Sequence, residues 1–172
     1  MAGIRVRAAQ LGDCQEIMRM IKELAKHIKS PEQVKNTTKG LRRDGFEEPS
    51  PLFRCLVAEV PMGPREEQGP SLVGYAFTYN SYSTWKGRSL HLEDLYVMPQ
   101  YRGHGIGTKL LKAVAEMCLT LGCCHLQFSI LDWNSPALSL CLSHGAADLS
   151  KDEGWHLYRI PPDKLRRMVS AL

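Results

Sequence analysis

The stretch that most constrains the fold is VMPQYRGHGIGTKLL, residues 97–111. It predicts a β-strand that ends at Met98, a turn that contains Gly103, Gly105 and Gly107, and a helix that begins directly after the turn. Glycines let the backbone approach a ligand closely, and the first turn of a helix presents unpaired N–H groups at the positive end of its dipole. This combination is typical of a site for a pyrophosphate.

Two common nucleotide-binding loops fit these glycines poorly. The Gly-Lys-Ser/Thr of a Walker A loop is absent, and the Gly-x-Gly-x-Gly spacing differs from the Gly-x-Gly-x-x-Gly of dinucleotide-binding folds. A glycine-rich helix start without any ligand is the structural alternative. It does not account well for three glycines beside Tyr101 and Arg102, because glycine is unfavourable in a helix.

The rest of the chain alternates between strand and helix patterns, which predicts one mixed α/β domain over residues 1–172. The helix patterns include one in which Asp13 is a plausible N-cap, with an apolar face of Ile17, Met20, Ile21, Leu24 and Ile28. The expected strands are residues 4–8, 53–60, 71–83, 89–98, 123–131 and 154–160. The expected helices are residues 11–28, a weaker region at 30–45, 105–122, a short helix after Asn134, and a helix or tail at 161–172. Residues 61–70 are expected to form a hairpin loop, and Gly87 to lie in a tight turn.

Composition excludes some classes of function. The formal net charge is only +4, without a long basic run, so we expect no nucleic-acid partner and interpret KLRRM as a solvated helix face. No stretch approaches the length of a membrane span, and the N-terminus does not resemble a signal peptide. The six cysteines lack zinc-finger spacing, so we expect no metal and a reduced, cytoplasmic protein with no membrane partner.

Two adjacent acids stand out in the strand LHLEDLYVM. Transfer of an acyl group to an amine needs a base, because an alkylamine is mostly protonated at neutral pH. Glu93 and Asp94 lie one strand length before the glycine turn. Neighbours on a regular strand point to opposite faces, so one of them should face a cleft unless a bulge intervenes. The alternative is a pair of surface acids on an edge strand.

Several motifs carry a family resemblance. QYRGHGIG places Gln100, Gly103 and Gly105 in the pattern Gln/Arg-x-x-Gly-x-Gly/Ala, and YSTWKGR, LEDLYVMPQYRGHGIG, ILDWN and GAADLSKDEGW accompany it in order. The sequence resembles the GCN5-related N-acetyltransferase (GNAT) family over nearly its whole length. Within the family it looks like the spermidine/spermine N1-acetyltransferase subfamily, nearest to its thialysine N-ε-acetyltransferase branch. The resemblance implies a mixed, mostly antiparallel central sheet flanked by helices, acetyl-CoA as cofactor, direct transfer in a ternary complex, and a homodimer.

The resemblance also implies roles for individual residues. Glu93 matches the proposed base and Asp94 a substrate-binding acid, while Trp85 and Trp155, if they are not core residues, would contact an alkylammonium chain. The implied cofactor contacts are Leu95, Tyr96, Val97, Arg102, Gly103, His104, Gly105, Ile106, Gly107, Thr108, Asn134, Ser135, Pro136 and Ala137. The implied substrate contacts are His27, Trp85, Glu93, Asp94, Gln127, Phe128, Ser129, Glu153 and Trp155.

Two departures concern the substrate. Ile28 and Ser83 stand where the polyamine branch has acids, so two contacts to a multiply charged polyamine are missing. This favours a shorter or lysine-like amine over spermidine and spermine. Thialysine, lysine analogues, and a modified lysine such as hypusine on a protein are all open.

A third departure concerns catalysis. Cys141 takes the place of the family tyrosine that is proposed to protonate the leaving CoA thiolate. A thiol, with an ordinary pKa near 8.5, can give up a proton, or Cys141 only fills space. The first hypothesis is therefore an amine N-acetyltransferase, and the second an acetyl-CoA-binding module with weak or lost catalysis. A redox cysteine protein is disfavoured, because no cysteine has a partner at a recognised spacing.

Overall fold

The computed structural model describes residues 3–60 and 71–170. The chain divides into two compact units, Met1–Ser129 and Ile130–Leu172, and each is described by itself. The hairpin loop expected at residues 61–70 lies outside the described residues.

The first unit is built on a five-stranded sheet in the order β1-β2-β3-β4-β5. Its strands are β1 (Arg5–Ala8), β2 (Arg54–Glu59), β3 (Leu72–Ser83), β4 (Gly87–Val97) and β5 (Leu126–Phe128). Neighbouring strands are antiparallel except β4 and β5, which are parallel. The mixed, mostly antiparallel sheet that the sequence predicts is therefore confirmed, although β5 is shorter than expected.

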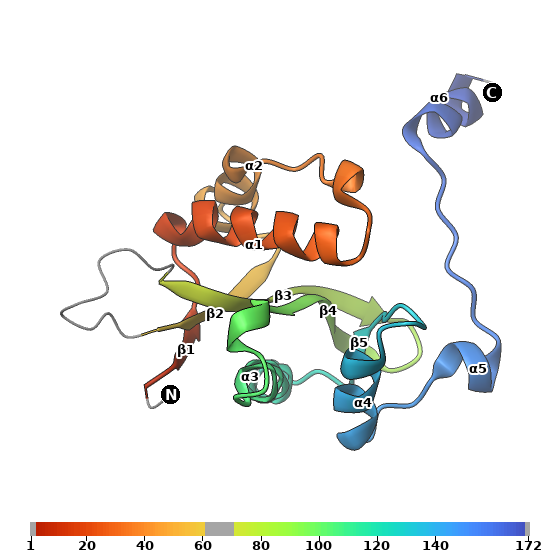
Figure 1. Cartoon of the computed structure of the whole chain (residues 1–172). Helices are drawn as coiled ribbons and strands as arrows, with labels where there is room; N and C mark the ends of the chain where they lie inside the picture. The colour runs from red at the N-terminus through yellow and green to blue at the C-terminus, as the bar shows by residue number, and fades with distance from the viewer. Residues whose placement is uncertain (1–2, 61–70, 171–172) are drawn as a thin grey trace. The chain divides into compact units, whose positions relative to one another are not determined.

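Helices cover both faces of this sheet (Figure 1). On one face lie α1 (Cys14–His27) and α2 (Thr38–Arg42), and on the other lies α3 (Ile106–Thr120), which connects the parallel strands β4 and β5. Buried Ile17 and Met20 confirm the apolar face expected for α1. The shorter turns of helix are η1 (Leu11–Asp13), η2 (Pro31–Gln33), η3 (Arg43–Glu47) and η4 (Pro99–Tyr101).

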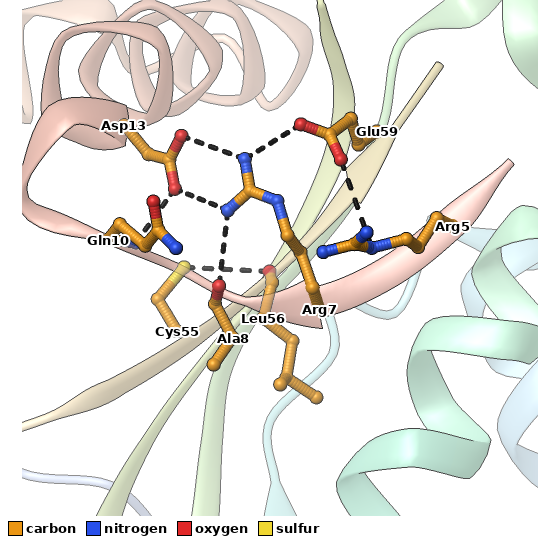
Figure 2. Close-up of polar contacts among 8 residues, drawn as sticks. All are labelled: Arg5, Arg7, Ala8, Gln10, Asp13, Cys55, Leu56 and Glu59. Atoms are coloured by element: carbon orange, nitrogen blue, oxygen red, sulfur yellow. Dashed lines mark hydrogen bonds and ion pairs between the residues drawn. The ribbon is translucent and has the colours of Figure 1, made fainter. Parts of the chain in front are cut away.

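A charged network ties β1 to the start of α1 and to β2 (Figure 2). Arg7 donates to both carboxylate oxygens of Asp13, at 2.7 and 3.1 Å, and to Glu59 at 3.0 Å. Asp13 is the N-cap residue of α1, as the sequence predicts, but its side chain accepts the backbone N–H of Gln10 and makes no capping bond to the helix. Burial alone would raise the pKa of Asp13, but its bonds to Arg7 and Gln10 hold that pKa below its usual value.

The second unit contains α4 (Ser135–Ser143), α5 (Leu149–Glu153) and α6 (Pro162–Ser170). The expected helix after Asn134 is confirmed, with Pro136 in its first turn, although Asn134 makes no side-chain capping bond. The final strand expected at residues 154–160 is wrong, since the structure describes no strand there. Alternating residues permit a strand, but a strand also needs a neighbour for its backbone hydrogen bonds.

Candidate functional site

The glycine turn has the geometry of an anion site. Gly103 and Gly105 have φ values of 78° and 75°, a left-handed conformation that favours glycine, and Gly105 is the N-cap of α3. Gly105 has no side chain that could cap this end of α3, and a Cβ atom at either glycine would meet nothing within 4 Å. The first turn of α3, which begins at Ile106, can therefore offer its N–H groups to a bound pyrophosphate.

Side chains fix this turn against the sheet. Arg102 donates through Nε to the carbonyl oxygen of Val97 at 2.8 Å, and its guanidinium carbon lies 5.7 Å from the centre of the Tyr96 ring. The Tyr96 hydroxyl donates to Glu23 of α1 at 3.0 Å. Burial, together with this bond to Glu23, raises the pKa of Tyr96 to about 12. The end of β4, the turn and α1 are thus held together.

An open backbone edge leads from this turn along β4. The parallel pairing of β4 with β5 joins only Leu90–Leu92 to Leu126–Phe128, whereas β4 continues to Val97. In the described ranges no strand pairs with that edge over residues 93–97. Its N–H and C=O groups can pair with an extended ligand as a further strand would, which suits the contacts expected at Leu95, Tyr96 and Val97.

A β-bulge lies at the acidic pair. Thr78 of β3 lies opposite Leu92, and Phe77 lies opposite Asp94, so Glu93 is an extra residue in β4. The alternation of a regular strand, in which only one of the two acids faces a given side, therefore does not hold here.

Contacts show that both acids lie on the face of the sheet that α1 covers. Asp94 accepts a hydrogen bond of 2.9 Å from the hydroxyl of Tyr75. Glu93 Oε2 lies 3.4 Å from Nε2 of His91. Tyr79, which stands opposite His91 and stacks on its ring, is on the same face of β3 as Tyr75.

The two acids have different surroundings. Burial raises the pKa of Asp94; the bond from Tyr75 offsets this only in part, and the charge of Glu93 adds to it. Tyr75 is fully buried, and burial with the neighbouring Asp94 raises its pKa well above 10. The Glu93 side chain, in contrast, is 55% exposed. Sequence reasoning missed Tyr75 and His91, because their contacts depend on the register of β3 and on the bulge.

The other expected substrate residues of the first unit are spread over three elements. His27 is the last residue of α1, and Gln127 of β5 lies opposite His91 in the parallel register. Phe128 and Ser129 end this unit. Trp85 lies at the tip of the β3–β4 hairpin and is 82% exposed, so it is not a core residue. Ser83 accepts the backbone N–H groups of Trp85 and Lys86 at the same tip.

The remaining expected residues belong to the second unit. Asn134, Ser135, Pro136 and Ala137 form the start of α4. Cys141 is buried, and burial raises the pKa of its thiol. The indole N–H of Trp155, which is also exposed, donates to Glu153 at 2.6 Å.

Metal-ligand clusters and membrane-spanning helices are both missing from the described residues. The His, Cys, Asp and Glu side chains do not gather there into a group of three or more that could hold a metal ion. Every helix in the described ranges falls short of the length or the apolar character that a membrane-spanning helix requires.

Comparison with known proteins gives consistent matches. The model of the acetyltransferase (GNAT) family matches residues 18–146. The chain is 49% identical over 169 residues to thialysine N-epsilon-acetyltransferase of Bos taurus, covering 98% of this chain and 99% of that protein. It is 41% identical over 168 residues to spermidine/spermine N(1)-acetyltransferase-like protein 1 of Homo sapiens, covering 96% of this chain and 24% of that protein.

Solved structures match in fold. AAC(6')-Iy in complex with a bisubstrate analogue, CoA-S-monomethyl-acetylneamine, superposes with a TM-score of 0.71 at 15% identity, covering 93% of this chain and 99% of that one. At this level of identity the match shows the fold alone.

Proposed function

Because the chain belongs to the acetyltransferase (GNAT) family, in its spermidine/spermine acetyltransferase-like branch, it is an acetyl-CoA-dependent N-acetyltransferase, and we propose that it acts on lysine-like primary amines. The observation that carries the proposal is the bulge in β4. It brings Glu93 and Asp94 to one face of the sheet, on the strand whose open edge leads to the glycine turn.

The described residues fit acetyl-CoA. The N–H groups after Gly105 would hold the pyrophosphate, with Arg102, Gly103 and His104 beside them, and the open edge of β4 would hold the extended arm. The start of α4, residues 134–137, is proposed as a second contact. When bound, acetyl-CoA supplies the acetyl group as a thioester that an amine can attack.

We assign the base to Glu93 and the binding of the ammonium group to Asp94. The exposed Glu93 carboxylate is free to meet an incoming amine, directly or through water. Asp94 is held in place by Tyr75 and is less exposed to solvent. Glu93→Gln is therefore expected to lower kcat by about 100-fold or more while acetyl-CoA still binds. Glu116→Gln, on the exposed side of α3, is the matched control and is expected to behave as wild type.

The substrate preference follows from missing acids. Ile28 ends α1 where the polyamine branch has an acid, and Ser83 uses its hydroxyl to cap the hairpin turn. Trp85, His27, Gln127, Phe128 and Ser129, with Glu153 and Trp155, remain the proposed amine contacts. The name of the bovine relative supports a lysine-like amine such as thialysine, and a modified lysine on a protein, such as hypusine, also fits. A competition assay is expected to give thialysine a higher kcat/KM than spermine, and the reverse order would overturn the preference.

Cys141 bears on how the CoA thiolate is protonated. A buried thiol with a raised pKa is a weaker acid than an ordinary thiol, which supports a space-filling role. Cys141→Ala is then expected to keep kcat within about twofold, and Cys141→Tyr to raise kcat if an acid is missing.

An assay of free CoA release with a panel of amines tests the proposed function itself. Amine-dependent release supports it. Acetyl-CoA binding without such release would instead support the alternative, a binding module with weak or lost catalysis.

Assembly and location are proposals that rest on the family resemblance: a homodimer with the site near the interface, in the cytoplasm. The exposed apolar side chains of Trp155, Leu157, Tyr158 and Ile160 support burial against a second copy. Sedimentation of the purified protein tests the dimer.

A further inference from the structure

His91 is a titratable residue that the proposed chemistry does not yet use. It precedes Glu93 by two positions on β4, and its Nε2 lies 3.4 Å from Glu93 Oε2. The histidine side chain is 18% exposed, whereas that of Glu93 is 55% exposed. Glu93 is therefore the member of the pair that solvent reaches, whereas the side chain of His91 is largely buried.

Tyr79 fixes the imidazole of His91. The two residues stand opposite each other on β3 and β4, and their rings stack with centroids 4.7 Å apart and planes 22° apart. Burial and the nearby Glu93 raise the pKa of Tyr79. Its phenol therefore stays neutral and adds no charge beside the Glu93 carboxylate. A stacked ring is restrained in its plane, which favours a constant approach of Nε2 to Glu93.

Several other charged and titratable groups that the structure describes on this face have surroundings that set them apart from His91. Asp94 is bound by Tyr75 of β3, and Glu23 of α1 is bound by Tyr96 and by Arg19. Cys55 of β2 is buried, and burial together with Asp94 raises its pKa, so it remains a neutral thiol. On β5, the residue opposite His91 is Gln127, which does not titrate. Glu93 is thus the acidic neighbour that the structure gives to His91.

We propose that His91 relays the proton that Glu93 removes from the substrate ammonium group, an inference that rests on the proposed function. The ammonium N–H bond breaks as its proton passes to a Glu93 carboxylate oxygen, which leaves a neutral amine. The Glu93 O–H bond then breaks as the same proton passes to His91 Nε2, which restores the carboxylate and leaves an imidazolium. The imidazolium gives the proton to water after the product leaves.

The relay has a chemical reason. A carboxyl group ordinarily titrates near pH 4.3 and holds a proton poorly at neutral pH, whereas imidazole ordinarily titrates near pH 6.5. When substrates displace water from the exposed side of Glu93, the imidazole is the nearby group that can keep the proton during transfer. His91 is accordingly a positioning and proton-storing residue that acts through Glu93.

The first test needs no turnover. NMR compares the imidazole signals of wild type and Glu93→Gln, and the His91 signal is identified by its loss in His91→Phe. Because Glu93 Oε2 lies 3.4 Å from His91 Nε2, Glu93→Gln is expected to shift the imidazole signals of His91. The signal of His125, just before β5, serves as the internal reference and is expected to stay in place. An unmoved His91 signal would overturn the contact on which the relay depends.

The second test is kinetic. His91→Phe keeps an aromatic ring to stack on Tyr79 but carries no proton. It is expected to lower kcat/KM for the amine about tenfold and to change the pH dependence of that rate constant. The KM for acetyl-CoA is expected to be unchanged, and His125→Gln to behave as wild type.

The outcomes separate the relay from the proposed function. Wild-type turnover with an unchanged pH profile in His91→Phe would overturn the relay and leave the function standing. If the wild type acetylated no amine in the panel, the function and the relay would both fall.

Discussion

Two adjacent carboxylates, Glu93 and Asp94, acquire different chemistry from their surroundings. The bulge leaves Glu93 exposed, whereas Asp94 is bound by the buried hydroxyl of Tyr75. Environments that separate neighbouring acids in this way are typical of sites that move protons. The separation gives each acid its own prediction at the scale of the single residue.

Asp94→Asn is expected to make the protein more stable and less active. Because burial raises the pKa of Asp94, the folded state keeps its proton to a higher pH than the unfolded state. Stability therefore falls as pH rises from the unfolded to the folded pKa, and the cost is fully present above that window. Asparagine removes the charge but still accepts the hydrogen bond from Tyr75, so thermal unfolding above this window should show a higher Tm.

The same variant is expected to lose about tenfold to 100-fold in kcat/KM, because a hydrogen bond to a charged ammonium group is weakened. Tyr75→Phe is the control: it leaves the Asp94 carboxylate without the hydrogen bond from Tyr75 and is therefore expected to lower Tm. A less stable Asp94→Asn would contradict the inferred cost of the buried charge.

At the scale of elements, α3 and its glycine turn form a local unit. Gly105 at its start and Gly122 just beyond its end both have positive φ, and a Cβ atom at either would meet nothing within 4 Å. Alanine at each position is expected to cost about 1 kcal/mol through backbone strain. Only Gly105→Ala would put a methyl group into the anion site, so it alone should raise the KM for acetyl-CoA, by about tenfold. Equal KM values for both variants would place the pyrophosphate elsewhere.

The Arg7 network joins three elements, and its loss is expected to destabilise the first unit. Arg7→Leu leaves Asp13 and Glu59 close together without their shared cation, which should cost about 2–3 kcal/mol in the free energy of unfolding. Arg5 is the matched control, because its side chain is exposed and its ion pair with Glu59 is long, at 4.0 Å. Arg5→Leu should change stability by no more than about 0.5 kcal/mol in denaturant unfolding. Similar losses for both would show that Arg7 acts as a surface charge.

Local signals explain why some elements could be predicted and others could not. Adjacent residues specify the turn at Gly103 and Gly105 and the helix after it, and the structure confirms both. The bulge at Glu93 depends on how β4 pairs with β3, and no spacing in one strand reveals it. Residues 154–160 alternate as a strand does, but alternation does not supply a partner.

At the scale of the whole molecule, the two units differ in how far their apolar side chains are buried. The first unit buries the middle of its sheet, including Val57, Val73 and Tyr75. In the second unit, residues 154–160 expose large apolar side chains and belong to no helix or sheet. An exposed apolar segment that belongs to no sheet is unusual for an isolated protein and is typical of a surface that another chain covers.

Hydrogen exchange should therefore depend on protein concentration in one segment. In the monomer, the amides of residues 154–160 are expected to exchange on the order of 10³-fold faster than those of β3, which open only with global unfolding. If the proposed homodimer covers this segment, raising the concentration should slow exchange at residues 154–160 and leave β3 unchanged, in step with dimer formation measured by sedimentation. Replacing Leu157 with Asp should weaken that dimer without altering exchange in β3. A dimer that forms while residues 154–160 still exchange rapidly would place the interface on another surface.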